Sequence, residues 1–353
     1  MQVWIRRFAL LLLPLGFLAV MVAAPLLSLA FYDGEGAWAE VVADDYMRLR
    51  LGWTVAQAVL TCVLVTALGV PAAWVLARMD FAGRRTVLRL LMLPFVMPTL
   101  VAGMGVLALF GAHGMLAAGW QDTPWLLIYG NVFFNLPVLV RSAYQGFVRV
   151  PQARLLSAQS LGADAWRRFV WVEWPVVRAW VAGGACLVFL YCFSGFGLAL
   201  LLGGERFATV EVEIYRLVAY ELDMARASVL VWLVLAVTAA AGGLYAYWSR
   251  RVAVDKSVSP LPPRAPVRAW EKWLTATVLV MLAVCCLLPL AAVWLKAVSA
   301  GSSWAVLLEA QTWAAVWNTV RFSAAAVAAA TVLGVLYAAA ARQMAWLRAL
   351  MFL

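Results

Sequence analysis

Long apolar segments alternate with short polar connections along the chain. An α-helix of about 20 apolar residues is long enough to cross the hydrocarbon core of a bilayer. We expect eight such transmembrane helices, at residues 8–31, 52–77, 90–112, 124–147, 179–202, 227–248, 273–295 and 317–341. The pattern therefore predicts an all-α, polytopic membrane protein.

The composition supports this class. Hydrophobic residues make up 66% of the 353 positions and charged residues only 12%, whereas about a quarter of the residues in soluble domains are charged. The five cysteines all lie inside apolar segments, and none has the spacing to a histidine or to another loop cysteine that a zinc site needs. We therefore expect neither a disulfide framework nor a metal site.

The 27 Lys and Arg residues are divided unequally between the two sides of the predicted membrane. Most of them lie at the N-terminus or in the alternate connections that share its side, and the opposite side is rich in Asp and Glu. Because basic residues concentrate in cytosolic connections, we expect the N-terminus and the connection 149–178 to be cytosolic. The net charge of +10 then reflects orientation in the membrane, and no nucleic-acid partner is expected.

A polar, basic and amphipathic stretch at residues 155–175 separates two apolar segments. Its apolar residues recur at roughly helical spacing, and Gly162 interrupts that pattern. Two short helices joined by a tight turn at Gly162 are therefore expected. A soluble partner could grip such a helix at the membrane face. The alternative is a surface helix that rests on the lipid headgroups.

Part of the chain is repeated. Pro25, Trp38, Thr54 and Leu68-Gly69 recur at nearly constant offset as Pro289, Trp304, Thr319 and Leu333-Gly334. Six predicted spans separate the copies, an even number, so the repeats are expected to be parallel. The first six-span unit is assigned to residues 1–248, a Pro-rich basic cytosolic linker to 249–271 and the start of a second unit to 272–353, where it is expected to be truncated after two spans.

Motifs of catalysis are missing from the sequence. It contains no G-x-x-x-x-G-K-[ST] phosphate loop and no H-E-x-x-H motif, and it has a single histidine. Ser194 is the one nucleophile that an intramembrane hydrolase could use, but no base lies within plausible reach. An ion-coupled carrier usually needs acidic groups at membrane depth, and none lies inside a predicted span. We therefore expect no catalytic residues here and a separate ATPase as the source of energy.

Four polar side chains inside or beside predicted spans are candidates for the translocation path. Asn131 and Asn135 are four residues apart and share one helix face. Buried amides either line a path or join helices through hydrogen bonds, and both interpretations stay open. Tyr191 and Ser194 are weaker candidates, for which packing in the core is favoured.

The 155–175 stretch resembles the cytosolic coupling loop of ABC-transporter permeases. That family has Glu-Ala-Ala, three residues, a Gly, and a Pro thirteen residues after the Gly. Leu156 and Ser157 stand where the family has its Glu and first Ala. The matching positions in this sequence are Ala158, Gly162, Phe169, Val172 and Pro175.

Three further motifs resemble the permease subunits of bacterial thiamine ABC transporters. They are Phe133-Phe-Asn-Leu-Pro137, Val172-Glu-Trp-Pro175, and Thr209-Val-Glu-Val-Glu-Ile-Tyr215 with Asp223-Met-Ala-Arg-Ala227. The resemblance implies the type I ABC importer (MetI-like) permease fold, an inner-membrane location and import of thiamine or its phosphates. It also implies two kinds of partner, namely ABC ATPase subunits that carry the ATP and Mg²⁺ and a periplasmic solute-binding protein. Ferric-iron ABC permeases share the general loop and are the alternative.

Overall fold

The structure is a computed structural model that describes residues 16–31, 36–116, 119–121, 123–250 and 261–343. Helices account for nearly all of its regular structure, and the described residues contain a single isolated β-bridge, between Met79 and Arg264. The all-α prediction is therefore confirmed. The chain divides into two compact units, one of residues 36–297 and one of residues 1–35 with 298–353, and each is described by itself.

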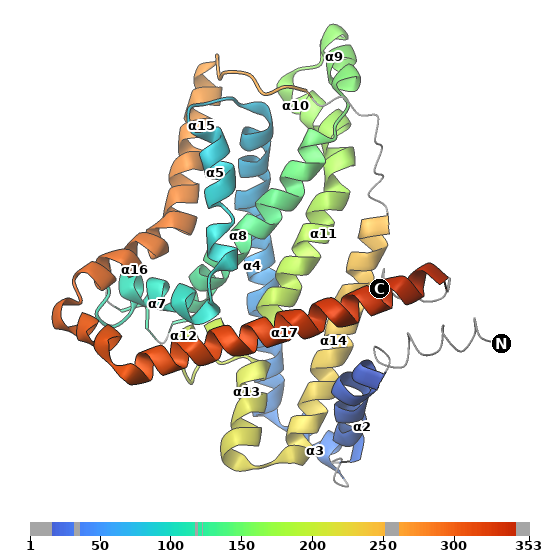
Figure 1. Ribbon diagram of the computed structural model, residues 1–353. Coiled ribbons are helices and arrows are strands. Elements are labelled where there is room, and N and C mark those ends of the chain that lie inside the picture. Colours follow the sequence, from blue (N-terminus) through green and yellow to red (C-terminus); the bar gives the residue numbers. More distant parts are fainter. Residues whose placement is uncertain (1–15, 32–35, 117–118, 122, 251–260, 344–353) are drawn as a thin grey trace. The chain divides into compact units, whose positions relative to one another are not determined.

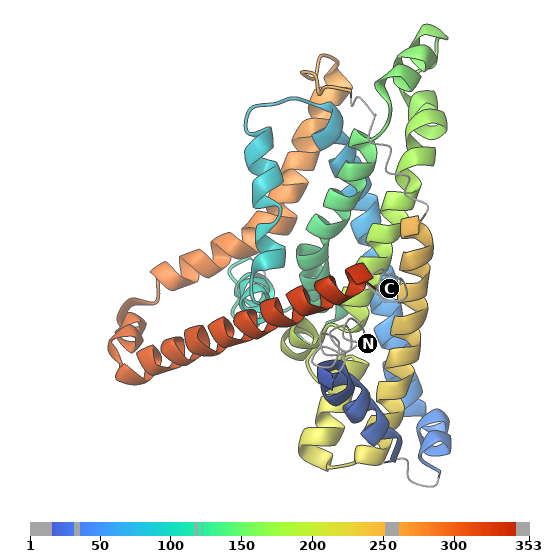
Figure 2. The ribbon, with the colours of Figure 1, turned by 45° about the vertical axis from the view of Figure 1, so that its right-hand side comes forward.

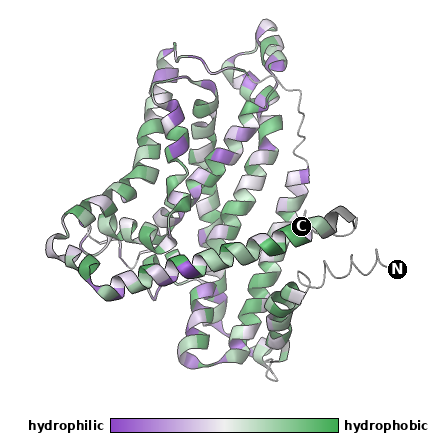
Figure 3. Ribbon diagram, in the orientation of Figure 1, coloured by the Kyte–Doolittle hydropathy of each residue, from purple (hydrophilic) through white to green (hydrophobic). Residues whose placement is uncertain are grey.

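Three long helices form the centre of the 36–297 unit. They are α4 (Asp45–Arg78), α8 (Pro124–Val148) and α11 (Trp174–Phe193), which pack against one another, with α14 (Met224–Arg250) beside α11 (Figures 1 and 2). Their shared core is built from apolar side chains such as Leu76, Leu139 and Val188, all fully buried. Figure 3 shows these helices as mostly hydrophobic, with polar positions gathered around α9 at one end of the unit and around α13 at the other.

Among the described residues, six helices are long and apolar enough to cross a membrane, or seven if a bent pair counts as one span. The helix α8 agrees with the predicted span 124–147 to within one residue. The helix α4 begins at Asp45, well before the predicted residue 52. Arg50, which bounds the apolar run in the sequence, lies inside this helix, and its guanidinium donates to the backbone oxygens of Glu205 (2.6 Å) and Arg206 (2.8 Å).

The predicted span at 90–112 is not one continuous helix. The structure has α5 (Arg84–Leu90), α6 (Leu93–Val96) and α7 (Thr99–Phe110), and the segments 84–96 and 99–110 are bent by 104°. Met97 between them is extended, with ψ of 146°. A residue before proline avoids the helical region, so Pro98 accounts for the break.

The predicted span 179–202 also differs from the structure. The helix begins far earlier, at Ala165, and ends at Phe193, and a separate short helix α12 (Phe196–Leu202) follows. Gly195 lies at the break, where a Cβ atom would approach the backbone oxygen of Tyr191 to 2.7 Å. Only glycine fits such a close backbone approach.

Shorter elements connect and flank these helices. The helix α3 (Ala37–Ala43) precedes α4. The helix α13 (Val210–Arg216), with the π-helical segment η3 (Leu217–Glu221), precedes α14. After the described part of the linker come α15 (Ala269–Leu282), the π-helical segment η4 (Ala283–Leu287) and α16 (Leu288–Val298). The α15 helix packs on α4 and η4 packs on α8, so this compact unit continues past residue 248, where the first sequence unit was expected to end. The sequence duplication itself stays a prediction.

The second unit contains the π-helical segment η1 (Ala19–Ala23), α2 (Ala24–Phe31), the 3₁₀ helix η5 (Gly301–Leu308) and α17 (Ala310–Gln343). The α17 helix covers the predicted span 317–341, and none of its described side chains is buried. The predicted span 8–31 can be compared only over its second part, where Gly16–Leu29 is an apolar helix. Residues 1–15, and 251–260 of the expected linker, lie outside the described residues.

Candidate functional site: an elbow at one end of the helix bundle

The helix α9 (Gln152–Ser160) lies at one end of the bundle and is followed by a tight turn. Gly162 in this turn has φ of +78°. The backbone N–H of Gly162 donates to the oxygen of Gln159 (3.0 Å) and that of Ala163 donates to the oxygen of Ala158 (3.0 Å). These two bonds form a Schellman motif, which closes a helix through a residue in the left-handed region. The turn expected at Gly162 is therefore confirmed.

The second half of the predicted loop is not a separate short helix. Asp164 caps the next helix, since its carboxylate accepts from the backbone N–H of Arg167 at 2.7 Å. From there α10 (Ala165–Arg168) continues through the π-helical segment η2 (Phe169–Glu173) directly into α11. We call residues 152–173, which comprise α9, the turn, α10 and η2, the elbow. One arm of the elbow is thus the end of a helix, Ala165–Phe193, that is long and apolar enough to span a membrane.

The predicted coupling-loop residues occupy different surroundings. Leu156 and Ser157 are exposed on α9, Ala158 is half-buried, and Pro175 is exposed in the first turn of α11. Val172 is half-buried against the main core, and the ring of Phe169 lies 6.3 Å from that of Phe147 in α8 and 5.9 Å from that of Trp166. The exposed apolar side chains of the elbow are Leu156, Leu161, Trp166 and Trp171.

An ion pair that the sequence did not reveal ties the elbow to α4. The Nε of Arg78 donates to Glu173 Oε1 at 2.9 Å, and Trp74 Nε1 donates to Glu173 Oε2 at 2.8 Å. The side chains of Arg78 and Glu173 are each 6% exposed. Arg78 also donates through Nη2 to the backbone oxygen of Phe147 (3.1 Å). Three helices therefore meet at this pair, which we call the Arg78–Glu173 clamp.

The described end of the linker is attached to the same place. The backbone N–H of Arg264 donates to the oxygen of Arg78 (3.0 Å), and its oxygen accepts from the N–H of Asp80 (2.8 Å). The guanidinium of Arg264 holds the buried carboxylate of Glu271, which also accepts from the backbone N–H groups of Val267 and Arg268. The end of α4 is thus bonded both to the elbow and to the segment that leads into α15.

The two candidate amides lie in a buried network between helices. Asn131 Nδ2 donates to Gln57 Oε1 (2.8 Å), and Gln57 Nε2 donates to the backbone oxygen of Cys192 (2.8 Å). Asn135 Nδ2 donates to the backbone oxygen of Asn131 (3.0 Å) and contacts Cys192 Sγ at 3.3 Å. Gln57, which the sequence analysis did not select, joins α4 to both α8 and α11. This arrangement fits the helix-joining interpretation of the amides.

The other two path candidates are separate from this network and are not core residues. Tyr191 and Ser194 are exposed within the chain, in contrast to the expected core packing. The ring of Tyr191 lies 5.7 Å from that of Phe95, and the hydroxyl of Ser194 donates to the backbone oxygen of Leu190 (2.6 Å). Both lie at the end of α11, next to the break at Gly195.

A third buried carboxylate, after Glu173 and Glu271, lies at the opposite end of the bundle. Glu213, in the Thr209–Tyr215 motif, accepts from the hydroxyl of Tyr46 at 3.0 Å and lies 3.5 Å from Arg216 Nη1 and 4.0 Å from Arg50 Nε. Burial raises the pKa of the neighbouring Glu211. Glu213 fixes the first turns of α4 against α13. Each end of α4 is thus held by one buried carboxylate.

Known sequences match this chain closely enough to define its relatives. The family described as "Binding-protein-dependent transport system inner membrane component" matches residues 66–254. The thiamine transport system permease protein ThiP of Salmonella typhimurium is 32% identical over 322 residues, which is 88% of this chain and 58% of that protein. ThiP of Escherichia coli is 32% identical over 327 residues, 88% of this chain and 60% of that protein. The sulfate transport system permease protein CysW of Synechocystis is 28% identical over 210 residues, which is 56% of this chain and 76% of that protein.

Solved structures share the fold. A chain of a bacterial alginate ABC transporter, in complex with an alginate pentasaccharide-bound periplasmic protein, superposes with a TM-score of 0.60 at 16% identity, covering 70% of this chain and 95% of that one. The type I ABC importer (MetI-like) permease fold is thereby confirmed. The chain spans about 60% of the length of the two enterobacterial ThiP proteins.

Proposed function

Because the chain belongs to the family of binding-protein-dependent transport system inner membrane components, we propose that it acts as the translocating permease subunit of an ATP-driven importer for thiamine or its phosphates. The observation that carries the importer assignment is the elbow. A solvent-facing helix, a glycine turn and a membrane-spanning helix follow one another there without interruption.

The elbow is the proposed dock of a separate ABC ATPase, which carries the ATP and Mg²⁺. Leu156, Leu161 and Trp166 are exposed around the Gly162 turn, where a soluble partner could cover them. Large aromatic and aliphatic side chains that fill a partner's pocket supply much of the energy of such contacts. The excess of basic residues at this end favours the cytosolic side, where an ATPase would meet it.

Force would pass from the elbow to the spanning helices by two routes. Residues 165–193 form one helical rod about 44 Å long at 1.5 Å per residue, so movement of its cytosolic end moves the membrane part. The Arg78–Glu173 clamp passes the same displacement to α4 and, through Phe147, to α8. In this role the coupling residues transmit motion and carry out no chemistry. The permease itself is not expected to be an enzyme.

The proposed substrate rests on the relatives. The two ThiP proteins named above are thiamine transport permeases at 32% identity, and three motifs of the sequence resemble the same group. A cationic solute also suits the acidic composition of the predicted outer face. Ferric iron is the second candidate, because the 155–175 stretch also resembles the coupling loop of ferric-iron permeases. A periplasmic binding protein would deliver the solute at the end of the bundle opposite the elbow. The alginate transporter of similar fold was solved in complex with a periplasmic protein.

The full-length permease, reconstituted in vesicles with its own ATPase and binding protein, tests this proposal. We expect ATP-dependent uptake of radiolabelled thiamine or thiamine diphosphate, and ATPase activity that rises when the loaded binding protein is added. Vesicles that contain the ATPase alone serve as the control. ATPase activity stimulated by ferric iron but not by thiamine would move the assignment to the iron permeases. Absence of any solute-dependent ATPase activity would refute the importer role.

A further inference from the structure

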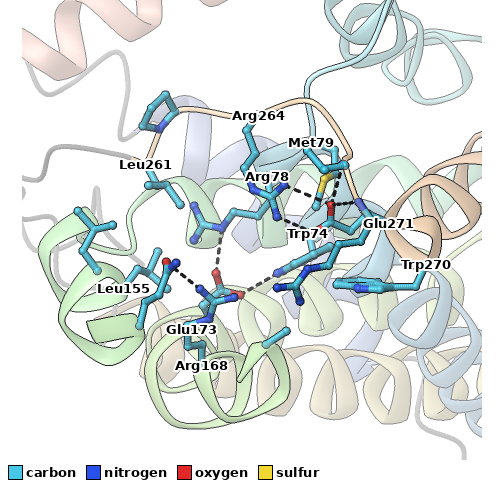
Figure 4. A pocket seen from close by; sticks show the side chains of 16 residues that line it. Trp74, Arg78, Met79, Leu155, Arg168, Glu173, Leu261, Arg264, Trp270 and Glu271 are labelled. Atoms are coloured by element: carbon cyan, nitrogen blue, oxygen red, sulfur yellow. Dashed lines mark hydrogen bonds and ion pairs between the residues drawn. The ribbon is translucent and has the colours of Figure 1, made fainter. Parts of the chain in front are cut away.

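A cavity of about 520 Å³ lies beside the elbow, between α9, α10, the last turn of α4 and residues 261–271 (Figure 4). Its polar lining includes Arg78, Arg168, Arg264 and Arg268, and its aromatic lining is Trp74 and Trp270. The two indole rings are stacked with centroids 6.1 Å apart. The proposed transport mechanism uses Arg78, Glu173 and Leu156 from its lining, but it assigns no ligand to the cavity itself.

The charges around the cavity do not balance. Its two carboxylates, Glu173 and Glu271, are held by Arg78 and Arg264. Arg168 donates to the neutral oxygen of Gln159 at 3.1 Å. Within the part of the chain that the structure describes, no ion pair links either Arg168 or Arg268 to a carboxylate. The lining therefore carries two uncompensated positive charges.

Arg78 adds a buried donor. Its Nε and Nη2 atoms are bonded to Glu173 and Phe147, but Nη1 is buried and has no hydrogen-bond partner among the described residues. Figure 4 shows the Arg78 guanidinium facing the cavity. A buried N–H without an acceptor is costly, and this one belongs to a charged group. The cavity thus offers a buried guanidinium donor and further guanidinium groups from Arg168 and Arg268.

We propose that this cavity binds a phosphate group. Guanidinium groups bind phosphate through paired hydrogen bonds in a fixed planar geometry, and four of them line the space. Arg264 is engaged with Glu271, which leaves Nη1 of Arg78 and the guanidinium groups of Arg168 and Arg268 for a ligand. Two sources present such a group at the cytosolic membrane face. Anionic phospholipids place phosphates at basic pockets between spanning helices, and soluble phosphorylated metabolites present phosphate with or without an aromatic ring that could pack on the tryptophans. The site does not depend on which solute is transported.

A bound phosphate would join elements that move in the proposed mechanism. It would bridge Arg78 on α4, Arg168 on the elbow and Arg268 at the start of α15. Occupancy would hold these three segments together. The site is therefore placed to stabilise one arrangement of the elbow.

Two binding measurements on the full-length permease test the site and separate the sources. In the first, the protein in nanodiscs of phosphatidylcholine alone is titrated with inorganic pyrophosphate. In the second, delipidated protein is offered phosphatidylglycerol mixed with phosphatidylcholine, and retained lipid is measured by native mass spectrometry. Binding of pyrophosphate identifies a soluble phosphate ligand, and selective retention of phosphatidylglycerol identifies a lipid headgroup.

Three variants assign the binding to this cavity. Arg168→Gln removes one charge whose only described side-chain bond is to Gln159, and Arg78→Lys keeps a positive charge beside Glu173 but deletes Nη1. Each should weaken binding about tenfold, the effect of losing one charge-assisted hydrogen bond. The neighbouring Arg167 is exposed and does not line the cavity, so Arg167→Gln should bind as the wild type does. The proposal is overturned if neither ligand binds, if both test variants bind normally, or if Arg167→Gln weakens binding equally.

Discussion

Arg78 and Glu173 form a buried ion pair, with Nε and Oε1 2.9 Å apart, that joins the last turn of α4 to the turn from which α11 emerges. Both force routes proposed above use this pair or the continuous α10–α11 rod. The pair holds α4 against α11, and in the proposed mechanism it would also pass a displacement of the elbow to α4.

The first prediction concerns the stability of the Arg78–Glu173 clamp. Replacing either partner alone, as in Arg78→Gln or Glu173→Gln, leaves the other charge buried without compensation and should cost about 3–5 kcal/mol of unfolding free energy. The double variant leaves two neutral amides and should be less destabilised than the sum of the single changes. Thermal unfolding in detergent measures both, with the exposed Arg178→Gln as control. Additive losses would mean that the two residues do not interact.

The second prediction concerns the turn at Gly162. A Cβ atom there would meet no other atom within 4 Å, so the backbone angle of φ +78° is the obstacle to a substitution. Valine should be strained by about 1–2 kcal/mol, whereas asparagine tolerates this region. We expect Gly162→Val to lower solute-stimulated ATPase activity and co-purification of the ATPase, and Gly162→Asn to retain most of both. If the two variants behave equally, coupling to the ATPase does not depend on the geometry of this turn.

Hydrophobic periodicity and turn signals predict those helices and turns whose structure depends on neighbouring residues alone. The apolar run of α8 and the glycine signal at residue 162 correspond to a helix and a turn in the structure. The bend at Met97 also has a local signal, because Pro98 disfavours a helical residue before it, but the continuous hydrophobic run around it conceals that break. The capping residue Asp164 was likewise a readable helix start that hydrophobicity alone did not show.

The site depended on contacts between residues far apart in the sequence. Glu173 is one acidic residue in a basic stretch, and nothing near it indicates that Arg78, 95 positions away, is its partner. Gln57 lies in an apolar run and gains its role only when Asn131 on another helix lies opposite it. The polarity of such residues marks them as candidates, but only the packing of the helices selects which pairs meet.

The third prediction concerns the amide pair of that network. Gln57→Leu should leave the amide of Asn131 and the backbone oxygen of Cys192 without their partner, at a cost of about 0.6–1.7 kcal/mol for such bonds inside membrane proteins. A double-mutant cycle of Gln57→Leu with Asn131→Leu, followed by thermal unfolding, should show coupling of that size. If instead both variants keep full stability but lose transport, the amides act on the solute path and not as links between helices.

The last prediction concerns orientation, and it follows from the uneven distribution of basic residues. Ser157 is exposed on the elbow, and Glu205 is exposed near α13 at the other end of the bundle. Single cysteines at these positions, in a chain whose five native cysteines are replaced, can be probed in intact cells with a membrane-impermeant thiol reagent. We expect Glu205→Cys to react in intact cells and Ser157→Cys to react only after the membrane is permeabilised, because the basic end is retained in the cytosol. Reaction of Ser157→Cys from outside would invert the topology and place the elbow where no cytosolic ATPase could reach it.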